Sequence, residues 1–185
     1  GGYWYNADYQ IILSFLDNPD YDYVCLIEND VLTQTSIDDI FEDMGKNKID
    51  YVFQPQSWPN TQWSHLNTCV GYYDSSKYIN KGLICVSFFS RQAISLLLKK
   101  RIEFSTRKRL NNIKTWPYCE GFISHEIITN KLKYKTLSDY SIDLEQYDWA
   151  PIYAPQEVSP NKNGFFHPIG EINEKFISSN FAQDY

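Results

Sequence analysis

Two carboxylates and an amide stand directly behind a strand-like apolar run near the start of the chain. The run "YDYVCLI" (21–27) is followed by Glu28, Asn29 and Asp30, after which the chain turns apolar again. Side chains alternate along an extended backbone, so Glu28 and Asp30 point to the same side. Oxygen donors of this kind suit Mg²⁺ or Mn²⁺, and either ion can in turn hold a diphosphate. The alternative is a pair of solvated loop acids, because E-x-D often occurs by chance.

The elements that must position this triplet alternate between helix and strand. The apolar pattern predicts helices over 6–18, 35–47, 91–104 and 119–134, and strands over 21–27, 50–55, 83–90 and 134–140. We expect Ser36 to cap the second helix and Gly45 to end it. The alternation predicts an α/β fold with a mostly parallel, Rossmann-like sheet flanked by helices. Ligands of such folds gather beyond the carboxyl ends of the strands, where the acidic triplet lies.

Two segments lack this periodicity. Residues 56–82 are polar and aromatic, and a segment of that length in a compact domain is usually functional or mobile. Residues from 148 onward are rich in Pro, Asn and Gly, and we expect them to wrap the surface. The chain as a whole has 15 Tyr, 11 Phe and 5 Trp. Such rings stack on sugar faces in saccharide clefts, although a Tyr-rich core is the simpler interpretation.

Length and charge limit the classes of function. The 185 residues suffice for one domain, 1–185, with a sizeable core. The net charge of −6 argues against a nucleic-acid partner held by phosphate contacts. The basic run "KKRIEFSTRKR" (99–109) is typical of a solvated helix end. Peripheral contact with a membrane surface, or with another anionic ligand, is the alternative for that run.

The cysteine pattern indicates a reducing environment. Cys25, Cys69, Cys85 and Cys119 are irregularly spaced and form no CxxC pair, which argues against a structural zinc site. Cys25 and Cys85 lie in apolar runs and are interpreted as small buried hydrophobic residues. No apolar stretch approaches the length of a membrane span, about 20 residues, and no signal peptide opens the chain. We therefore expect a cytoplasmic chain with reduced thiols, and the inner face of the membrane is the alternative location.

The block "WYNADYQIILSFLDNPDYDYVCLIENDV" (4–31) resembles the central segment of nucleotide-sugar glycosyltransferases with the GT-A fold. In that family a helix leads into a strand that ends in an Asp-x-Asp motif. The block is most similar to a bacterial-type polysaccharide branch with an E-x-D variant of the motif. Later segments agree in order, namely "GLICVSFFSRQAISLL" (82–97), "CEGFISHEI" (119–127) and "FFHPI" (165–169).

The resemblance implies roles for four residues. Asp30 would coordinate the Mn²⁺ or Mg²⁺ that bridges the donor diphosphate, and Glu28 would act through water, the metal or the donor ribose. His167 matches a position where some GT-A enzymes supply a further metal ligand, with an ordinary turn residue as the alternative. Glu120 would be the acceptor base of an inverting enzyme. Its rivals are Glu126 as the base, and a purely structural role for Glu120 as an acid at a helix N-terminus.

The function that the resemblance implies is transfer of a sugar from a nucleotide-sugar donor to a saccharide or glycan acceptor. Candidates for an aromatic acceptor platform are Trp58, Trp63, Tyr72 and Tyr73, each with core packing as the alternative. One departure concerns the start of the chain, because GT-A domains begin with base-binding strands that precede the helix at residue 6. We therefore expect a fragment or a shortened, partial domain.

Two other functions stay open. A noncatalytic glycan-binding or scaffolding relative would bind saccharide without turning over a nucleotide sugar. Another metal-dependent α/β enzyme, such as a phosphotransferase or hydrolase, would use Glu28 and Asp30 differently. The chain contains no Walker motif, no G-x-S-x-G and no H-E-x-x-H, which places this last alternative third.

Overall fold

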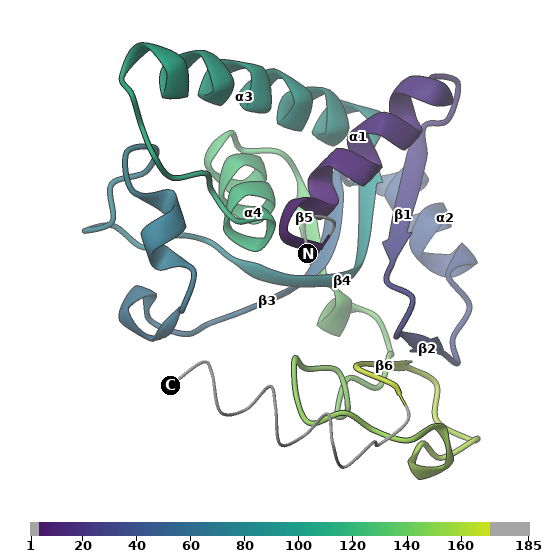
Figure 1. The fold of residues 1–185 in the computed structure, drawn as a ribbon. Helices are drawn as coiled ribbons and strands as arrows, with labels where there is room; N and C mark the ends of the chain where they lie inside the picture. The colour runs from purple at the N-terminus through teal and green to yellow at the C-terminus, as the bar shows by residue number, and fades with distance from the viewer. Residues whose placement is uncertain (1–3, 171–185) are drawn as a thin grey trace.

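The centre of the molecule is a four-stranded β-sheet. The computed structural model describes residues 4–170, and within them the sheet has the strand order β1-β4-β3-β5 (Figure 1). The strands span Tyr23–Ile27 (β1), Tyr51–Pro55 (β3), Gly82–Ser90 (β4) and Tyr134–Thr136 (β5). β4 pairs antiparallel with both β1 and β3, whereas β5 pairs parallel with β3.

The expected mixed α/β character is confirmed, but the described sheet is not mostly parallel. β1, β3 and β5 run in one direction, as helical crossovers between them require. β4 lies between β1 and β3 and runs the opposite way, so two of the three pairings are antiparallel. The reason is the connection after β3, whose last residue, Pro55, pairs with Gly82, the first residue of β4. Residues 56–81 thus leave and re-enter the sheet at the same edge and reverse the chain.

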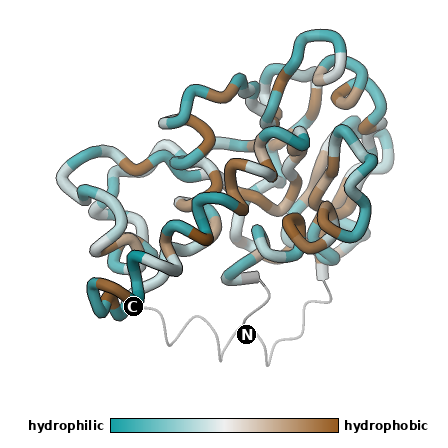
Figure 2. Tube along the Cα trace, turned by 90° about the horizontal axis from the view of Figure 1, so that it is seen from above, coloured by the Kyte–Doolittle hydropathy of each residue, from teal (hydrophilic) through white to brown (hydrophobic). Residues whose placement is uncertain are grey.

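Helices cover both faces of the sheet. α1 (Ala7–Asp17), α3 (Arg91–Leu110) and α4 (Cys119–Thr129) pack on one face, and α2 (Asp38–Asn47) lies on the other (Figure 1). Alternation along β3 divides its side chains, since Tyr51 and Phe53 join the core under α1, α3 and α4 while Val52 joins the core under α2. Figure 2 shows apolar stretches gathered in the interior and hydrophilic ones around the periphery.

The ends of α2 are set by a serine and by a left-handed residue. The backbone N–H of Asp38 donates to Ser36 Oγ over 3.2 Å, but the residue at the N-cap position of α2 is Ile37, one position after the expected cap. The helix continues through Gly45 and ends before Lys48, whose φ is 53°. The expectation that Gly45 ends the helix is therefore wrong. No heavy atom lies within 4 Å of a Cβ built at Gly45, so a residue with a side chain would fit at this position.

α3 is longer than predicted. Ser90 Oγ accepts a hydrogen bond from the Ala93 N–H at its start, and the helix runs to Leu110 rather than residue 104. Its last turn holds Arg107, Lys108 and Arg109, where the helix dipole favours cations. The basic run is thus a helix end. Among the described residues, no helix has both the length and the apolar character that crossing a bilayer would require.

The C-terminal segment folds back over the end of β1. β2 (Leu32–Thr33) pairs antiparallel with β6 (Phe165–Phe166), and the Ile169 N–H donates to the Asp30 carbonyl over 2.7 Å. Both phenylalanines of β6 are fully buried. The expectation that everything after residue 148 wraps the surface is therefore wrong for this part. The return of the chain brings His167 next to the acidic triplet.

The remaining elements are a short strand and short 3-10 helices. The predicted strand over 134–140 ends at Thr136, because a 3-10 helix with a capping box between Thr136 and Asp139 follows at once. Short 3-10 helices span Trp4–Asn6 (η1), Asn60–Gln62 (η2), Leu66–Cys69 (η3), Leu137–Asp139 (η4) and Pro155–Glu157 (η5).

Candidate metal site

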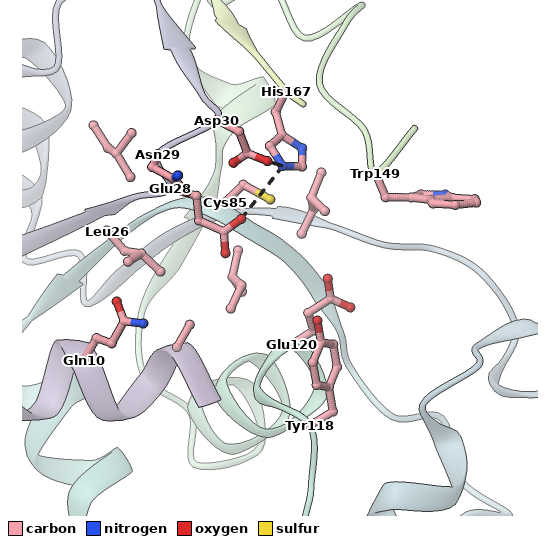
Figure 3. A pocket seen from close by; sticks show the side chains of 14 residues that line it. Gln10, Leu26, Glu28, Asn29, Asp30, Cys85, Tyr118, Glu120, Trp149 and His167 are labelled. Atoms are coloured by element: carbon pink, nitrogen blue, oxygen red, sulfur yellow. Dashed lines mark ion pairs between the residues drawn. The ribbon is translucent and has the colours of Figure 1, made fainter. Parts of the chain in front are cut away.

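A cavity of about 650 Å³ opens at the carboxyl end of β1. Five parts of the chain line it: α1, the end of β1, the start of β4, the start of α4 and the C-terminal segment. Figure 3 shows Glu28, Asp30 and His167 grouped together, with Glu120 on the α4 side and Trp149 on the C-terminal segment. The structure thus brings to one cavity the four residues for which the sequence suggested metal-binding or catalytic roles.

Glu28 is held by the sheet. Its backbone N–H donates to the Cys85 carbonyl over 2.9 Å, which continues the β1–β4 ladder by one residue. In that register Glu28 lies opposite Cys85, and directly opposed residues of an antiparallel pair place their side chains on the same face. A carboxylate and a thiol therefore share one side of the cavity, a pairing that depends on which strands are neighbours.

The hydrogen bonding of His167 determines which ring nitrogen is free. Nδ1 is bonded to the carbonyl oxygen of Asp148, and since a carbonyl can only accept, Nδ1 carries the proton. Nε2 lies 3.8 Å from Glu28 Oε2 and 3.6 Å from Asp30 Oδ2. The ring therefore directs Nε2 toward two carboxylates. Either a proton on Nε2 or a bound cation must lie between these groups for the arrangement to be favourable.

The electrostatics of Glu28 favour a positive ion at the same place. Burial raises the pKa of Glu28, and the nearby Asp30 carboxylate adds to this effect. The Cys85 thiol and His167 act in the opposite direction. A divalent cation would supply the positive charge that balances the ionised carboxylates. Carboxylates and an imidazole whose second nitrogen is fixed by a backbone carbonyl are ligand types that metal sites use, and the ligand atoms of Glu28, Cys85 and His167 lie within 4.8 Å of one another.

Glu120 lies in the first turn of α4. Burial raises the pKa of this carboxyl to about 8, and the charge of Glu28 contributes in the same direction, while the Trp63 indole opposes it. Glu126, its rival, is six positions further along the helix and does not line the cavity. The Glu126 carboxylate instead lies 3.7 Å from Lys100 Nζ. Of the two acids, Glu120 is the one positioned to meet a ligand.

The predicted aromatic platform does not line this cavity. Trp63 and Tyr72 are buried, and Tyr73 packs its ring against Phe104 and His125. Trp58 is exposed but lies in the β3–β4 connection, outside the cavity lining. For Trp63 and Tyr72 the structure corrects the expectation, since protein covers the ring faces that a sugar would need.

Trp63 nevertheless supports the site. A Cβ added at Gly121 would lie 2.4 Å from its indole ring, so the glycine next to Glu120 permits the close packing of this ring on α4.

Two lining residues were missed from the sequence. Trp149 is 54 % exposed and lines the cavity, where Tyr118 is buried. The position of Trp149 in a Pro-rich tail gave no periodic signal. Cys85 was interpreted as a small hydrophobic residue, and it is indeed buried, but it also faces Glu28 and His167. Only the pairing of β1 with β4 reveals that Cys85 faces these two residues.

Comparison of the chain with protein-family models and with curated proteins finds no match. The case for a function therefore depends on the geometry of the cavity and on the residue types that line it.

Proposed function

We propose that this chain is a metal-dependent glycosyltransferase domain that transfers a sugar from a nucleotide-sugar donor to a saccharide or glycan acceptor. The observation that carries the proposal is the convergence of Glu28, Asp30, His167 and Glu120 on one cavity at the carboxyl end of β1. The resemblance of residues 4–31 to GT-A glycosyltransferases supports the same reading, and the four cysteines, all unpaired, fit the reducing cytoplasm.

Glu28, Asp30 and His167 would hold the metal ion. Asp30 is the more exposed of the two carboxylates, with 42 % of its side chain accessible against 25 % for Glu28, so it is the better placed to meet an entering diphosphate complex. Mn²⁺ or Mg²⁺ bound here would offset the negative charge that develops on the departing diphosphate. His167, oriented by the Asp148 carbonyl, would offer Nε2 to the ion.

Glu120 would act on the acceptor. In an inverting transfer a base removes the proton of the acceptor hydroxyl as its oxygen attacks the anomeric carbon. A carboxylate whose pKa is raised to about 8 by burial is a stronger base than a solvated one, and only its deprotonated form can take up that proton, so transfer should rise as the pH approaches about 8. Trp149, exposed at the cavity, offers an apolar ring against which a pyranose can stack.

A transfer assay on the chain tests the proposal. We expect nucleoside diphosphate binding to require Mn²⁺ or Mg²⁺, and Asp30→Asn to abolish that binding while leaving the circular dichroism unchanged. We expect Glu120→Gln to keep donor binding but to lower kcat by about 10²–10⁴-fold, the usual effect of removing a general base. Glu126→Gln, on the same helix, is the matched control and should retain most of the activity.

The outcomes separate the alternatives. Equal nucleotide affinity of wild type and Asp30→Asn, with or without EDTA, would remove the metal assignment. Transfer at the wild-type rate by Glu120→Gln would remove the base. Saccharide binding by a wild-type chain that neither transfers nor hydrolyses any nucleotide sugar would favour the noncatalytic glycan-binding relative.

A further inference from the structure

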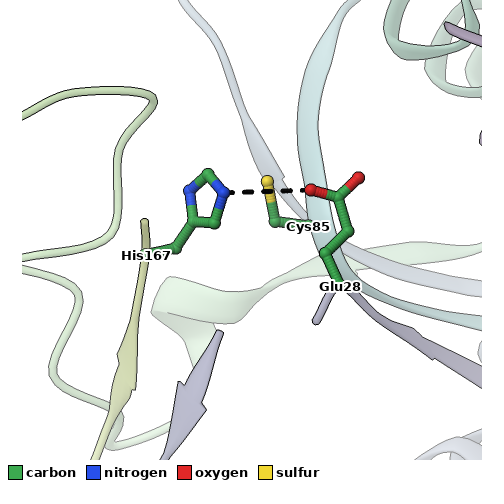
Figure 4. Close-up of side chains that lie close together, drawn as sticks. All are labelled: Glu28, Cys85 and His167. Atoms are coloured by element: carbon green, nitrogen blue, oxygen red, sulfur yellow. Dashed lines mark ion pairs between the residues drawn. The ribbon is translucent and has the colours of Figure 1, made fainter. Parts of the chain in front are cut away.

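The proposed function uses the oxygen and nitrogen ligands of the cavity and leaves Cys85 unexplained. Its Sγ, a carboxylate oxygen of Glu28 and a ring nitrogen of His167 all lie within 4.8 Å of one another (Figure 4). Cys85 is 5 % exposed and belongs to β4, so the sheet holds its thiol in place. Mg²⁺ and Mn²⁺ prefer oxygen ligands, whereas a thiolate selects softer ions such as Zn²⁺.

We infer that the cavity has a second mode of metal binding, in which Glu28, Cys85 and His167 hold a thiophilic divalent cation such as Zn²⁺. The inference concerns the same cavity as the proposed function, and its regulatory consequence rests on that function. The absence of a CxxC pair had argued against zinc, but here the ligands come from three separate parts of the chain.

The observed spacing suits a tetrahedral ion after small side-chain movements. Zn–N and Zn–S bonds of ordinary length place neighbouring ligand atoms about 3.5 Å apart. His167 Nε2 lies 3.8 Å from Glu28 Oε2 and 3.6 Å from Asp30 Oδ2. Asp30 lies outside the group whose ligand atoms are all within 4.8 Å of one another, so its carboxylate would have to move toward the ion to become the fourth ligand. The hydrogen bond from His167 Nδ1 to the Asp148 carbonyl is the outer contact that commonly orients an imidazole ligand.

The two modes differ in what they leave open. Mg²⁺ or Mn²⁺ retains several coordination positions for water or phosphate oxygens. Four protein ligands complete the shell of Zn²⁺, as in closed structural sites, and no position remains for a diphosphate. Binding exchanges the S–H bond of Cys85 for an S–Zn bond, the proton passes to solvent, and no group is oxidised or reduced. Zn²⁺ would thus exclude the donor and inhibit transfer.

Cobalt provides a direct probe, because Co²⁺ bound by a thiolate gives a near-ultraviolet charge-transfer band. The reduced, EDTA-treated chain is titrated with Co²⁺, and the band is then displaced with Zn²⁺ to obtain the zinc affinity. We expect wild type to show the band. Cys85→Ser should lose it and bind Zn²⁺ at least about tenfold more weakly, while Mn²⁺ affinity is unchanged.

The matched control is Cys25→Ser, because Cys25 lies on the adjacent strand β1 and is not part of the cluster. It should keep both the band and the zinc affinity. Cys85→Ala serves as a second variant, and circular dichroism shows that the variants fold. A wild-type chain without the band, or a Cys85→Ser chain that retains it, would overturn the inference.

A parallel titration with Mn²⁺ and a nucleoside diphosphate separates this inference from the proposed function. Mn²⁺-dependent nucleotide binding without a cobalt–thiolate band would contradict the zinc mode and leave the proposed function in place. A cobalt–thiolate band without Mn²⁺-dependent nucleotide binding would contradict the proposed donor site and support the zinc mode. Zn²⁺ that weakens nucleotide binding to wild type, but not to Cys85→Ser, would support both the mode and its inhibitory effect.

Discussion

At the scale of single residues, the site contains groups whose burial or arrangement is energetically unfavourable in the folded chain. The Glu120 carboxyl is desolvated by burial, and His167 directs Nε2 toward the carboxylates of Glu28 and Asp30. Such groups reduce stability when no ligand is present, and they are retained where a proton or a cation is to be bound. The loss of stability caused by burying the Glu120 carboxylate depends on pH.

Glu120 should make the metal-free chain less stable as the pH rises. Its pKa is about 8 in the folded chain against an ordinary value of 4.5, so between these values the folded state holds a proton that the unfolded state has lost. The free energy of unfolding contributed by this group therefore falls across that window as pH increases. Glu120→Gln should remove this fall, making the variant more stable than wild type at pH 8 and similar at about pH 4.

Urea denaturation in EDTA at several pH values measures this effect. Glu42→Gln, a change to an exposed acid on α2, should keep the wild-type pH dependence. If the Glu120→Gln curve runs parallel to wild type over the whole range, the raised pKa of Glu120 is wrong.

At the scale of elements, a buried ion pair fixes the helices around the cavity. Arg101 of α3 donates to both carboxylate oxygens of Asp8 on α1, at 2.6 and 2.9 Å. The same guanidinium donates to the Pro117 carbonyl, just before α4, and lies 3.6 Å from the ring centroid of Phe122. Asp8 and Arg101 are almost fully buried. This pair therefore sets the position of α4 and, with it, of Glu120.

Asp8→Asn should destabilise the chain strongly. The change leaves the Arg101 charge buried with no opposite charge, and breaking a buried pair in this way costs about 3–5 kcal/mol. Chemical denaturation measures the loss. Asp22→Asn is the control, because Asp22 and Arg91 form an exposed pair at 3.6 Å and such pairs contribute little. A similar small loss for both variants would show that the Asp8–Arg101 pair does not hold the helices together.

At the scale of the whole molecule, the cavity joins the β1 edge of the sheet to the C-terminal segment. Glu28 and Asp30 follow β1, whereas His167 follows β6. The direct backbone links between these parts include the short β2–β6 pair and the hydrogen bonds Ile169–Asp30 and Gln34–Gly164. A bound cation would add a crosslink between two parts of the chain that are far apart in sequence. Its effect should be local to the segment that it ties down.

Hydrogen exchange should detect this crosslink. We expect Mn²⁺ to slow amide exchange in residues 143–169 relative to EDTA, with little change in α3, which does not line the cavity. His167→Ala should abolish the slowing, because the C-terminal segment then contributes no ligand. Equal slowing throughout the chain, or slowing that persists in His167→Ala, would contradict a metal bridge at this position.

Several local features could be read from the sequence. The helices predicted over 6–18 and 91–104, and the strands predicted over 21–27 and 83–90, correspond to α1, α3, β1 and β4 with different ends, and they follow from apolar periodicity, which acts within a few residues. The acidic triplet at the end of β1 was also evident, because strand and acids are adjacent in the chain. These features depend on short-range physics, so the order of residues alone determined them.

Other features were decided by tertiary structure. The direction of β4 depends on how residues 56–81 return the chain, and that direction places Cys85 opposite Glu28. The burial of Trp63 and Tyr72, and the exposure of Trp149 at the cavity, depend on which surfaces the helices and the C-terminal segment cover. Contacts between residues distant in the chain carry no periodic signal, because packing and strand pairing select them. The sequence by itself determined the residues available for chemistry, and the tertiary structure decided which of them meet.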